Sequence, residues 1–236
     1  MAEKNQIVII IPTYNELENI DPIVKGIFEF LPHAKIFFVD DNSPDGTANK
    51  IQKLQNTNSN ILLLKRKAKL GLGSAYLEAF HEVIRKQLGQ VIVTMDGDLS
   101  HPISALSIMT NLVNDYDLVV GSRYIHGGGI KNWPIQRKLL SYFANFYART
   151  FTRTPIYDMT SGFMSFKIGV LGIIDLDQIH SDGYAFLIEL KYLFYHSKAR
   201  ILEYPITFTE RRLGESKLSG GVIAEAVWLP IRFFFK

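Results

Sequence analysis

Two aspartates separated by one glycine, Asp96-Gly97-Asp98, are the residues of this chain best suited to chemistry. They follow the aliphatic run Val91–Met95, which places them in a turn at the end of a predicted strand. A nucleoside diphosphate needs a hard cation such as Mg²⁺ or Mn²⁺, which takes one or two carboxylates and completes its shell with phosphate and water. The turn is therefore a candidate metal site, although an isolated Asp-x-Asp more often caps a helix.

A second pair of aspartates also follows an aliphatic run. Asp40 and Asp41 come directly after Ile36–Val39, and Asn42–Gly46 has the composition of a tight turn. Asp41 can accept hydrogen bonds from a nucleobase or ribose. Asp45 is the expected cap of the following helix.

Two further turns contain residues of possible use. Pro12–Glu16 follows Ile7–Ile11 and offers a rigid turn, an aromatic ring and a carboxylate, with Asn15 as the expected helix cap. Gly71–Ser74 opens a predicted helix but lacks the Gly-Lys-Ser/Thr ending of a P-loop. Tight helix packing is the favoured interpretation of these glycines.

Basic residues occur in several segments. Arg123, Arg137 and the stretch Arg211–Leu218 carry guanidinium groups that suit phosphorylated substrates, with ordinary surface charge as the alternative. Solvated surface is the prediction for the run Lys65, Arg66, Lys67 and Lys69. The histidines show no metal-ligand spacing, and His101 beside the acidic turn is as compatible with a structural role as with a catalytic one.

These residues require elements that bring them together. Aliphatic runs alternate with helical patterns through the first half of the chain, which predicts an α/β fold: a mostly parallel sheet with helices on both faces. Ligands of such sheets bind beyond the carboxyl ends of the strands. Four segments are therefore expected at one rim: Pro12–Glu16, Asp40–Asp41, Asp96–Asp98 and Gly121–Arg123.

The second half of the chain is less regular. We expect an aromatic-rich helix over Arg137–Thr152, a strand near Phe163–Phe166, a helix over Tyr184–Tyr195 and extended structure over Ala199–Phe208. The chain is predicted to form a single domain over residues 1–220. Residues 221–236 form an apolar or amphipathic segment.

Composition excludes several classes of protein. The net charge of +3 over 236 residues does not indicate nucleic-acid binding. The absence of cysteine excludes disulfides and thiolate metal sites. The aliphatic run Ile7–Ile11 is too short for a signal peptide, and no window reaches the roughly 18 apolar residues of a membrane span.

Taken together, the motifs resemble the dolichyl-phosphate mannose synthases, within the family-2 glycosyltransferases of GT-A fold. The matching stretches occur in family order: Pro12–Glu16, Val39–Thr47, Gly71–Tyr76, Met95–Pro102, Gly121–Tyr124, Asn132–Ser141, Ser161–Phe163 and Arg211–Leu218. The resemblance implies a Rossmann-like GT-A domain. It also implies inverting transfer of mannose from GDP-mannose to a polyprenyl phosphate.

The resemblance further implies roles for individual residues. Pro12, Tyr14, Glu16, Val39 and Asp41 would hold the nucleotide, with Arg211 and Lys217 closing over the donor. Asp96 and Asp98 would serve Mg²⁺ or Mn²⁺ and the diphosphate, with Gly97 contributing backbone. Arg123, Arg137 and Ser141 would form the acceptor-phosphate pocket, with Arg123 close to the reaction. Ser100 stands where some members carry a metal-binding glutamine, so a water is expected to replace that ligand.

The chemistry also favours a lipid phosphate as acceptor. A sugar hydroxyl needs a general base, whereas a phosphate is already anionic and needs only cationic positioning. The aromatics of Arg137–Thr152 and Val227–Phe235 lie beside basic residues and suit helices on a membrane surface, with core packing as the alternative. The chain ends near Lys236 without the transmembrane tail of some members. We therefore expect peripheral attachment at the cytoplasmic face, through this surface or an anchoring partner subunit.

Three alternatives remain open from the sequence. The donor could be UDP-glucose or another nucleotide sugar, because no motif fixes the base or the sugar. The acceptor could be a glycan hydroxyl. The chain could also be a nucleotide-sugar-binding subunit without activity.

Overall fold

The computed structural model describes residues 6–210 and 220–235. The strands are β1 (Ile7–Thr13), β2 (Lys35–Asp40), β3 (Ile61–Lys65), β4 (Val91–Thr94), β5 (Leu118–Ser122), β6 (Gly129–Lys131), β7 (Met164–Lys167), β8 (Ile201–Pro205) and β9 (Thr207–Thr209). The helices are α1 (Ile20–Phe30), α2 (Thr47–Thr57), α3 (Leu72–Lys86), α4 (Leu106–Leu112), α5 (Ile135–Thr152), α6 (Gly183–His196) and α7 (Gly220–Phe234).

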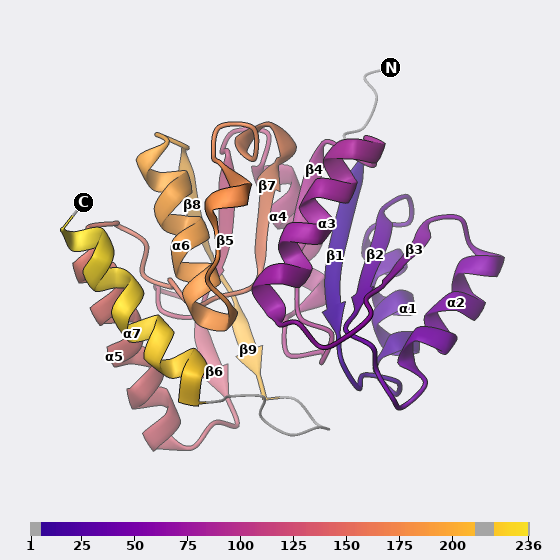
Figure 1. The fold of residues 1–236 in the computed structure, drawn as a ribbon, viewed down its shortest axis with the longest axis horizontal. Helices are drawn as coiled ribbons and strands as arrows, with labels where there is room; N and C mark the ends of the chain where they lie inside the picture. The colour runs from indigo at the N-terminus through magenta and orange to yellow at the C-terminus, as the bar shows by residue number, and fades with distance from the viewer. Residues whose placement is uncertain (1–5, 211–219, 236) are drawn as a thin grey trace.

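The larger sheet has the order β3-β2-β1-β4-β7-β5-β8 (Figure 1). All neighbours pair in parallel except β7, which runs antiparallel between β4 and β5. The predicted α/β fold with a mostly parallel sheet is confirmed. The antiparallel direction of β7 was not predicted, because the sequence of a four-residue strand does not indicate its direction.

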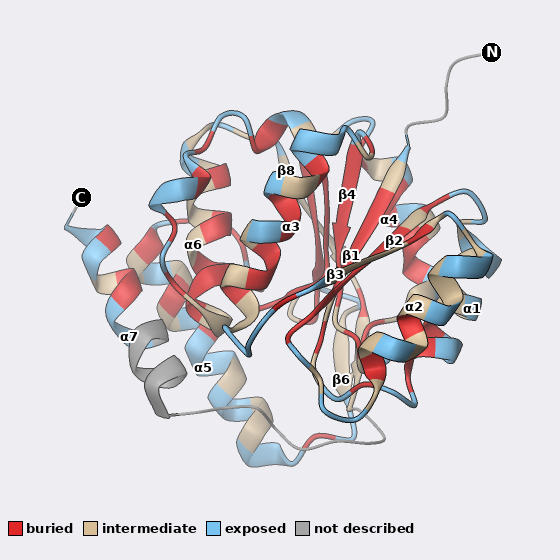
Figure 2. Cartoon of the chain, turned by 45° about the vertical axis from the view of Figure 1, so that its right-hand side comes forward, coloured by how far each residue is buried: buried red, intermediate tan, exposed pale blue. Residues whose placement is uncertain are grey.

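Helices cover both faces of this sheet and bury its strands, which are largely red in Figure 2. One core joins the sheet to α3 and α6 through Tyr76, Phe80, Phe186 and Phe194. The other joins it to α1, α2 and α4 through residues such as Ile23. Strands buried on both faces must be apolar at nearly every position, which explains the continuous aliphatic runs.

The second sheet is small and consists of β6 paired in parallel with β9. It extends the rim of the main sheet, because Ile206 N–H donates to Ser122 O and Thr209 N–H donates to Ser100 O. The loop of the acidic turn is thereby joined to β9. Helices α5 and α7 pack on each other, and α7 also packs on α6 (Figure 1).

Most predicted elements occur, with shifted ends. The first helix begins at Ile20 rather than Glu16, and its N-cap is Asn19, so the prediction that Asn15 caps it was wrong. Asn15 instead has φ 57° in the connecting turn. The N-cap of α2 is Gly46 rather than Asp45, although the carboxylate of Asp45 accepts from the N–H of Thr47, the first residue of α2.

Candidate functional site

A cavity of about 560 Å³ lies at the carboxyl ends of β1, β2, β4 and β5. Its walls include residues from each of the four segments predicted to meet there: Pro12, Thr13, Tyr14, Glu16, Asp41, Asp96, Gly97, Asp98 and Arg123. The second half of the chain adds further residues to the wall: Trp133, Arg137, Thr160, Ser161, Gly162, Asp182, Gly183, Tyr184, Leu187, Phe208 and Glu210. The volume suits a small-molecule substrate.

The acidic turn forms part of one wall. Asp96 and Asp98 line the cavity, and Asp98 Oδ1 accepts from the N–H of Ser100 at 3.1 Å. Ser100 itself does not line it: this residue is 2% exposed, and no hydrogen-bond partner of its Oγ lies among the described residues. Its placement gives no support to the predicted role as a metal ligand.

His101 holds the acidic turn in place. Its Nδ1 accepts from the N–H of Asp96 at 3.1 Å, and its Nε2 lies 3.7 Å from Asp96 Oδ2. The ring stacks on Phe163 with centroids 4.9 Å apart and meets Phe208 edge-on. An accepting Nδ1 requires the proton on Nε2, facing the carboxylate. His101 therefore has a structural role, which the sequence had left open.

Asp41 is supported from behind by a buried arginine. Arg66 pairs with Asp41, and its other nitrogens donate to Glu78 at 2.9 Å and Ser74 Oγ at 2.6 Å. The prediction that Arg66 is solvated was wrong, because the residue is 7% exposed. A buried guanidinium needs several acceptors, and a charge run in the sequence does not say which member finds them.

The remaining residues of this wall come from two loops. Lys69 Nζ lies 4.1 Å above the ring of Tyr14, and Glu16 accepts from Asn19 at 2.8 Å. Val39 does not reach the cavity, because its side chain is fully buried in the core. Of the residues predicted to bind the donor, Arg211 and Lys217 lie outside the described part of the chain.

The glycines of Gly71–Ser74 serve close packing, as predicted. Gly71 has φ 100°, and a Cβ there would collide with the carboxylate of Asp182. A Cβ on Gly73 would collide with Ser181 O, and the Gly73 N–H donates to Asp182 Oδ1 at 2.6 Å. These contacts bring α6 against the start of α3 at the cavity.

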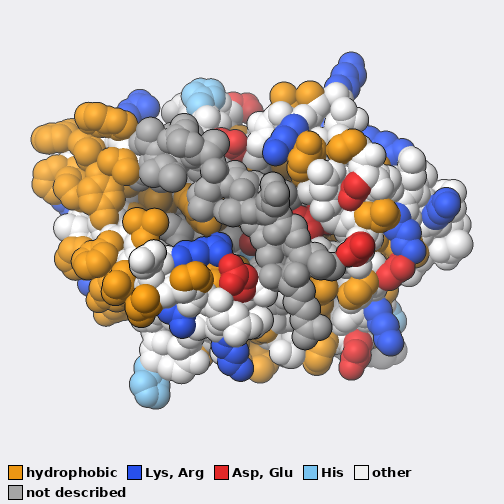
Figure 3. All heavy atoms as spheres, turned by 90° about the horizontal axis from the view of Figure 1, so that it is seen from below, with side chains coloured by type: hydrophobic (Ala, Val, Ile, Leu, Met, Phe, Trp, Pro, Cys, Tyr) orange, Lys and Arg blue, Asp and Glu red, His pale blue; other side chains and the backbone are white. Residues whose placement is uncertain are grey.

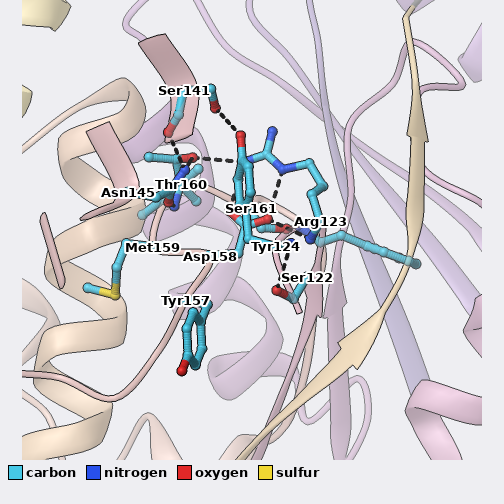
Figure 4. Close-up of polar contacts among 12 residues, drawn as sticks. Ser122, Arg123, Tyr124, Ser141, Asn145, Tyr157, Asp158, Met159, Thr160 and Ser161 are labelled. Carbon is cyan, nitrogen blue, oxygen red and sulfur yellow. Dashed lines mark hydrogen bonds and ion pairs between the residues drawn. The ribbon is translucent and has the colours of Figure 1, made fainter. Parts of the chain in front are cut away.

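The opposite wall centres on Arg123, which is 8% exposed (Figure 4). Its Nε and Nη2 donate to Asp158 at 2.8 and 2.7 Å, and Nη2 also donates to Thr160 at 2.8 Å. Burial raises the pKa of Asp158, but the adjacent guanidinium outweighs it, so the pKa lies below its usual value. Within the described residues, Nη1 of Arg123 has no protein acceptor.

Arg137 lies at the same wall in a more exposed setting. Its guanidinium lies 3.9 Å from the ring centre of Trp133 and donates to Glu210 at 2.7 Å. Ser141 does not line the cavity; its Oγ accepts from Tyr124 at 2.7 Å (Figure 4). Arg123 and Arg137 are thus brought to one wall, with Ser141 behind it.

Lys191 lies behind this wall and was missed by the sequence reasoning. It is fully buried on α6, and its Nζ donates to Met159 O at 3.1 Å and Ser161 O at 2.7 Å. Burial lowers its pKa to about 7. The available indication was a lysine in the stretch 185–195, which is otherwise apolar or aromatic apart from Glu189. The sequence around Asp158, in contrast, contains no indication that this residue contributes to the wall.

The carboxylates suit a cation that takes most of its ligands from elsewhere. In residues 6–210 and 220–235, no group of three His, Cys, Asp or Glu side chains is arranged to hold a metal ion. Asp96 and Asp98 nevertheless line one cavity, and one or two carboxylates are what Mg²⁺ uses beside a bound diphosphate.

An apolar face lies beside the cavity on α5 and α7 (Figure 3). Five of its exposed members on α5 follow the spacing of one helical stripe, Ile135, Leu139, Tyr142, Phe143 and Phe146, and the exposed Leu140 lies to one side of it. On α7 Trp228 is 66% exposed, and Phe235 directly after this helix is 82% exposed, whereas Leu229 and Phe233 pack inward against α6. No helix in the described part of the chain is long and apolar enough to cross a membrane.

Comparison with known proteins gives consistent results. The profile described as glycosyl transferase family 2 matches residues 8–172. The undecaprenyl-phosphate mannosyltransferase of Micrococcus luteus is 38% identical over 94% of this chain and 91% of its own length. The polyprenol monophosphomannose synthase of Mycolicibacterium smegmatis is 41% identical over 93% of this chain and 83% of its own.

A solved structure shares the fold. The glucosyl-3-phosphoglycerate synthase of Mycobacterium tuberculosis, solved with Mn²⁺, UDP-glucose and phosphoglyceric acid, superposes with a TM-score of 0.67. The match covers 96% of this chain and 80% of the other at 15% identity, so it supports the GT-A architecture alone.

Proposed function

The chain belongs to glycosyl transferase family 2, and from this membership we propose that it transfers mannose from GDP-mannose to a polyprenyl phosphate with inversion. The names of the mannosyltransferase of Micrococcus luteus and the monophosphomannose synthase of Mycolicibacterium smegmatis support a polyprenyl-phosphate acceptor and a mannosyl group. One observation carries the proposal: a single cavity is lined both by the carboxylates of the acidic turn and by two arginines, Arg123 and Arg137. That arrangement suits an anionic donor bound through a cation and an anionic acceptor bound directly.

The donor lies along β1, β2 and β4 in this proposal. Tyr14 and Asp41 contact the nucleoside, with Pro12 and Glu16 shaping the turn, and Gly97 contributes backbone. Asp96 and Asp98 hold Mg²⁺ or Mn²⁺, which supplies charge stabilisation for the departing diphosphate. Arg211 and Lys217 are assigned to the donor by resemblance. Val39 contributes as part of the strand that carries Asp41.

The acceptor phosphate lies against Arg123 and Arg137, and Ser141 helps to fix the wall through Tyr124. A phosphate oxygen attacks the anomeric carbon as the bond to the diphosphate breaks, so a single displacement inverts that carbon. The phosphate needs no base. Each carboxylate that lines the cavity already has a partner: Asn19 for Glu16, Arg66 for Asp41, His101 for Asp96, Ser100 N–H for Asp98, Gly73 N–H for Asp182 and Arg137 for Glu210.

The apolar face of α5 and α7 lies against the membrane that carries the lipid. The first turn of α5 bears both Arg137 at the cavity and the exposed Ile135, so the phosphate site and the apolar stripe share one helix. Arg149 and Arg153 at the end of this helix add positive charge that suits anionic headgroups. Attachment at the cytoplasmic face, by this surface or an anchoring subunit, completes the proposal.

The experiment is to incubate the full chain with labelled GDP-mannose, Mn²⁺ or Mg²⁺, and a polyprenyl phosphate, and to extract the lipid product. We expect a mannolipid whose formation stops when the cation is chelated. Parallel reactions with UDP-glucose and other nucleotide sugars test the donor. Product from those donors but none from GDP-mannose would overturn the donor assignment, and transfer to a glycan but to no lipid phosphate would overturn the acceptor.

A further inference from the structure

Trp133 occupies the space between the two arginines of the acceptor wall. It lines the cavity, is 8% exposed, and lies directly before α5. The Arg123 guanidinium is 5.9 Å from its ring and that of Arg137 is 3.9 Å. Phe208 meets the ring edge-on at 5.4 Å. The indole is therefore fixed on several sides by groups of the wall.

The indole N–H has no acceptor within the described residues. A buried tryptophan normally finds a partner for this group, because an unpaired donor away from water costs stability. Ring packing and stacking with a guanidinium need only an aromatic ring, which phenylalanine would supply. An unsatisfied N–H at a cavity wall thus indicates that a ligand supplies the acceptor.

The charge around Trp133 specifies that ligand. Two guanidinium groups adjoin the ring, and the nearby carboxylate of Glu210 is already paired with Arg137. An anion bound between the arginines is the acceptor that an adjacent N–H would meet. We propose that the indole N–H of Trp133 donates a hydrogen bond to the phosphate of the acceptor. This inference rests on the proposed function, in which that phosphate lies between Arg123 and Arg137.

A neighbour must move before the ligand reaches the covered N–H. Arg137 is the neighbour suited to move, because it is held by an ion pair with Glu210 in which each side chain is about one-third exposed. Exposed pairs are weak, and a phosphate is a better bidentate acceptor than a single carboxylate contact. Arg137 lies over the face of the indole, so when the phosphate draws it from Glu210 the space beside the ring opens to the ligand. Arg123 stays in place, because buried Asp158 holds it.

Intrinsic fluorescence tests this without altering Trp133. The chain has two tryptophans, so Trp228→Phe leaves Trp133 as the only one. This variant is titrated with geranyl phosphate, with geraniol and with GDP. We expect a saturable shift in emission with geranyl phosphate alone. No shift with geranyl phosphate, an equal shift with geraniol, or a shift with GDP would overturn the proposal.

Kinetics of Trp133→Phe provide the second test, because phenylalanine keeps an aromatic ring beside the arginines but has no N–H. We expect the KM for polyprenyl phosphate to rise roughly tenfold, the effect of one charge-assisted hydrogen bond, with the KM for GDP-mannose unchanged. An unchanged acceptor KM would overturn the proposal. If the wild-type chain forms no mannolipid, the proposed function fails; if it forms one and either test on Trp133 is negative, only this inference fails.

Discussion

The donor wall and the acceptor wall of the cavity each contain a buried arginine–aspartate ion pair, but a different member of the pair lines the cavity in each. Each rests on a buried arginine–aspartate pair, Arg66 with Asp41 and Arg123 with Asp158. On the donor wall the aspartate lines the cavity and the arginine stays behind it. On the acceptor wall the arginine lines the cavity and the aspartate stays behind.

The difference shows how one type of ion pair produces walls of opposite charge. The member behind the wall fixes the orientation of its partner and limits the cost of burying it. The member at the cavity presents its remaining lone pairs or N–H groups to a ligand. Burial differs as well: the Asp158 side chain is completely buried, whereas that of Asp41 keeps 9% exposure.

The largest expected effect is a loss of transfer activity when a carboxylate of the acidic turn, on the donor wall, is removed. Asp98→Ala is expected to reduce transfer by about 1,000-fold or more, because it removes one of two carboxylates that hold the cation at the leaving group. Initial rates at saturating donor and acceptor measure this. Asp177→Ala, at an 86% exposed side chain away from the cavity, is the matched control. Full activity of Asp98→Ala would refute the metal site.

The next effect is on stability and compares the two pairs directly. Asp158→Ala leaves the Arg123 charge buried without its partner, which is expected to lower the free energy of unfolding by roughly 3–5 kcal/mol. Arg66→Ala leaves Asp41 beside the cavity, where water reaches it, so the expected loss is smaller, roughly 1–3 kcal/mol. Urea denaturation followed by circular dichroism measures both.

The exposed pair Arg200–Asp117 supplies the control for these variants. Arg200→Ala should cost less than about 1 kcal/mol, since surface pairs contribute little. A larger loss from Arg66→Ala than from Asp158→Ala would contradict the difference in burial between the walls.

A pH effect is expected on the acceptor side. Burial lowers the pKa of Lys191 to about 7, whereas a lysine of the unfolded chain titrates near 10.4. Between these two pKa values Lys191 is protonated in the unfolded state but not in the folded state, so the free energy of unfolding rises with pH. Below about pH 7 both states are protonated, and this dependence on pH disappears. From about pH 7 to 9 the free energy of unfolding is expected to increase by roughly 2 kcal/mol.

Urea denaturation at a series of pH values compares wild type with Lys191→Met, which should lack this rise. Lys198→Met, at an exposed position after α6, is the control and should keep it. Equal pH slopes in all three proteins would show that Lys191 keeps an ordinary pKa.

The smallest expected effect is on the KM values, and it distinguishes the two walls because each wall is proposed to bind a different substrate. Arg66→Lys keeps the charge but loses the fork that orients Asp41, so the KM for the donor should rise roughly fivefold, about 1 kcal/mol, with the acceptor KM unchanged. Arg85→Lys on the exposed side of α3 is the control. A rise in the acceptor KM instead would mean that the two walls do not act separately.

The sequence predicted the donor wall better than the acceptor wall. Tyr14, Asp41 and Asp96 each follow a buried parallel strand, and parallel strands end at one edge, so their meeting required no tertiary information. The acceptor wall depends on an antiparallel strand, the small β6–β9 sheet and the packing of α6. None of these follows from a local pattern, and Trp133, Asp158 and Lys191 were missed for that reason.

The sequence by itself determined the alternation of strands and helices, the rim at which the ligand residues gather and the family. Only the tertiary structure decided which charges pair and which face the cavity. Arg66 reaches Asp41 across 25 residues, Arg123 reaches Asp158 across 35, and Arg137 reaches Glu210 across 73. Residue pairs this far apart in the sequence follow no helical or strand periodicity, so the sequence pattern does not predict that they pair. Burial selects such pairs, because a charge taken from water is stable only beside the partner that the fold supplies.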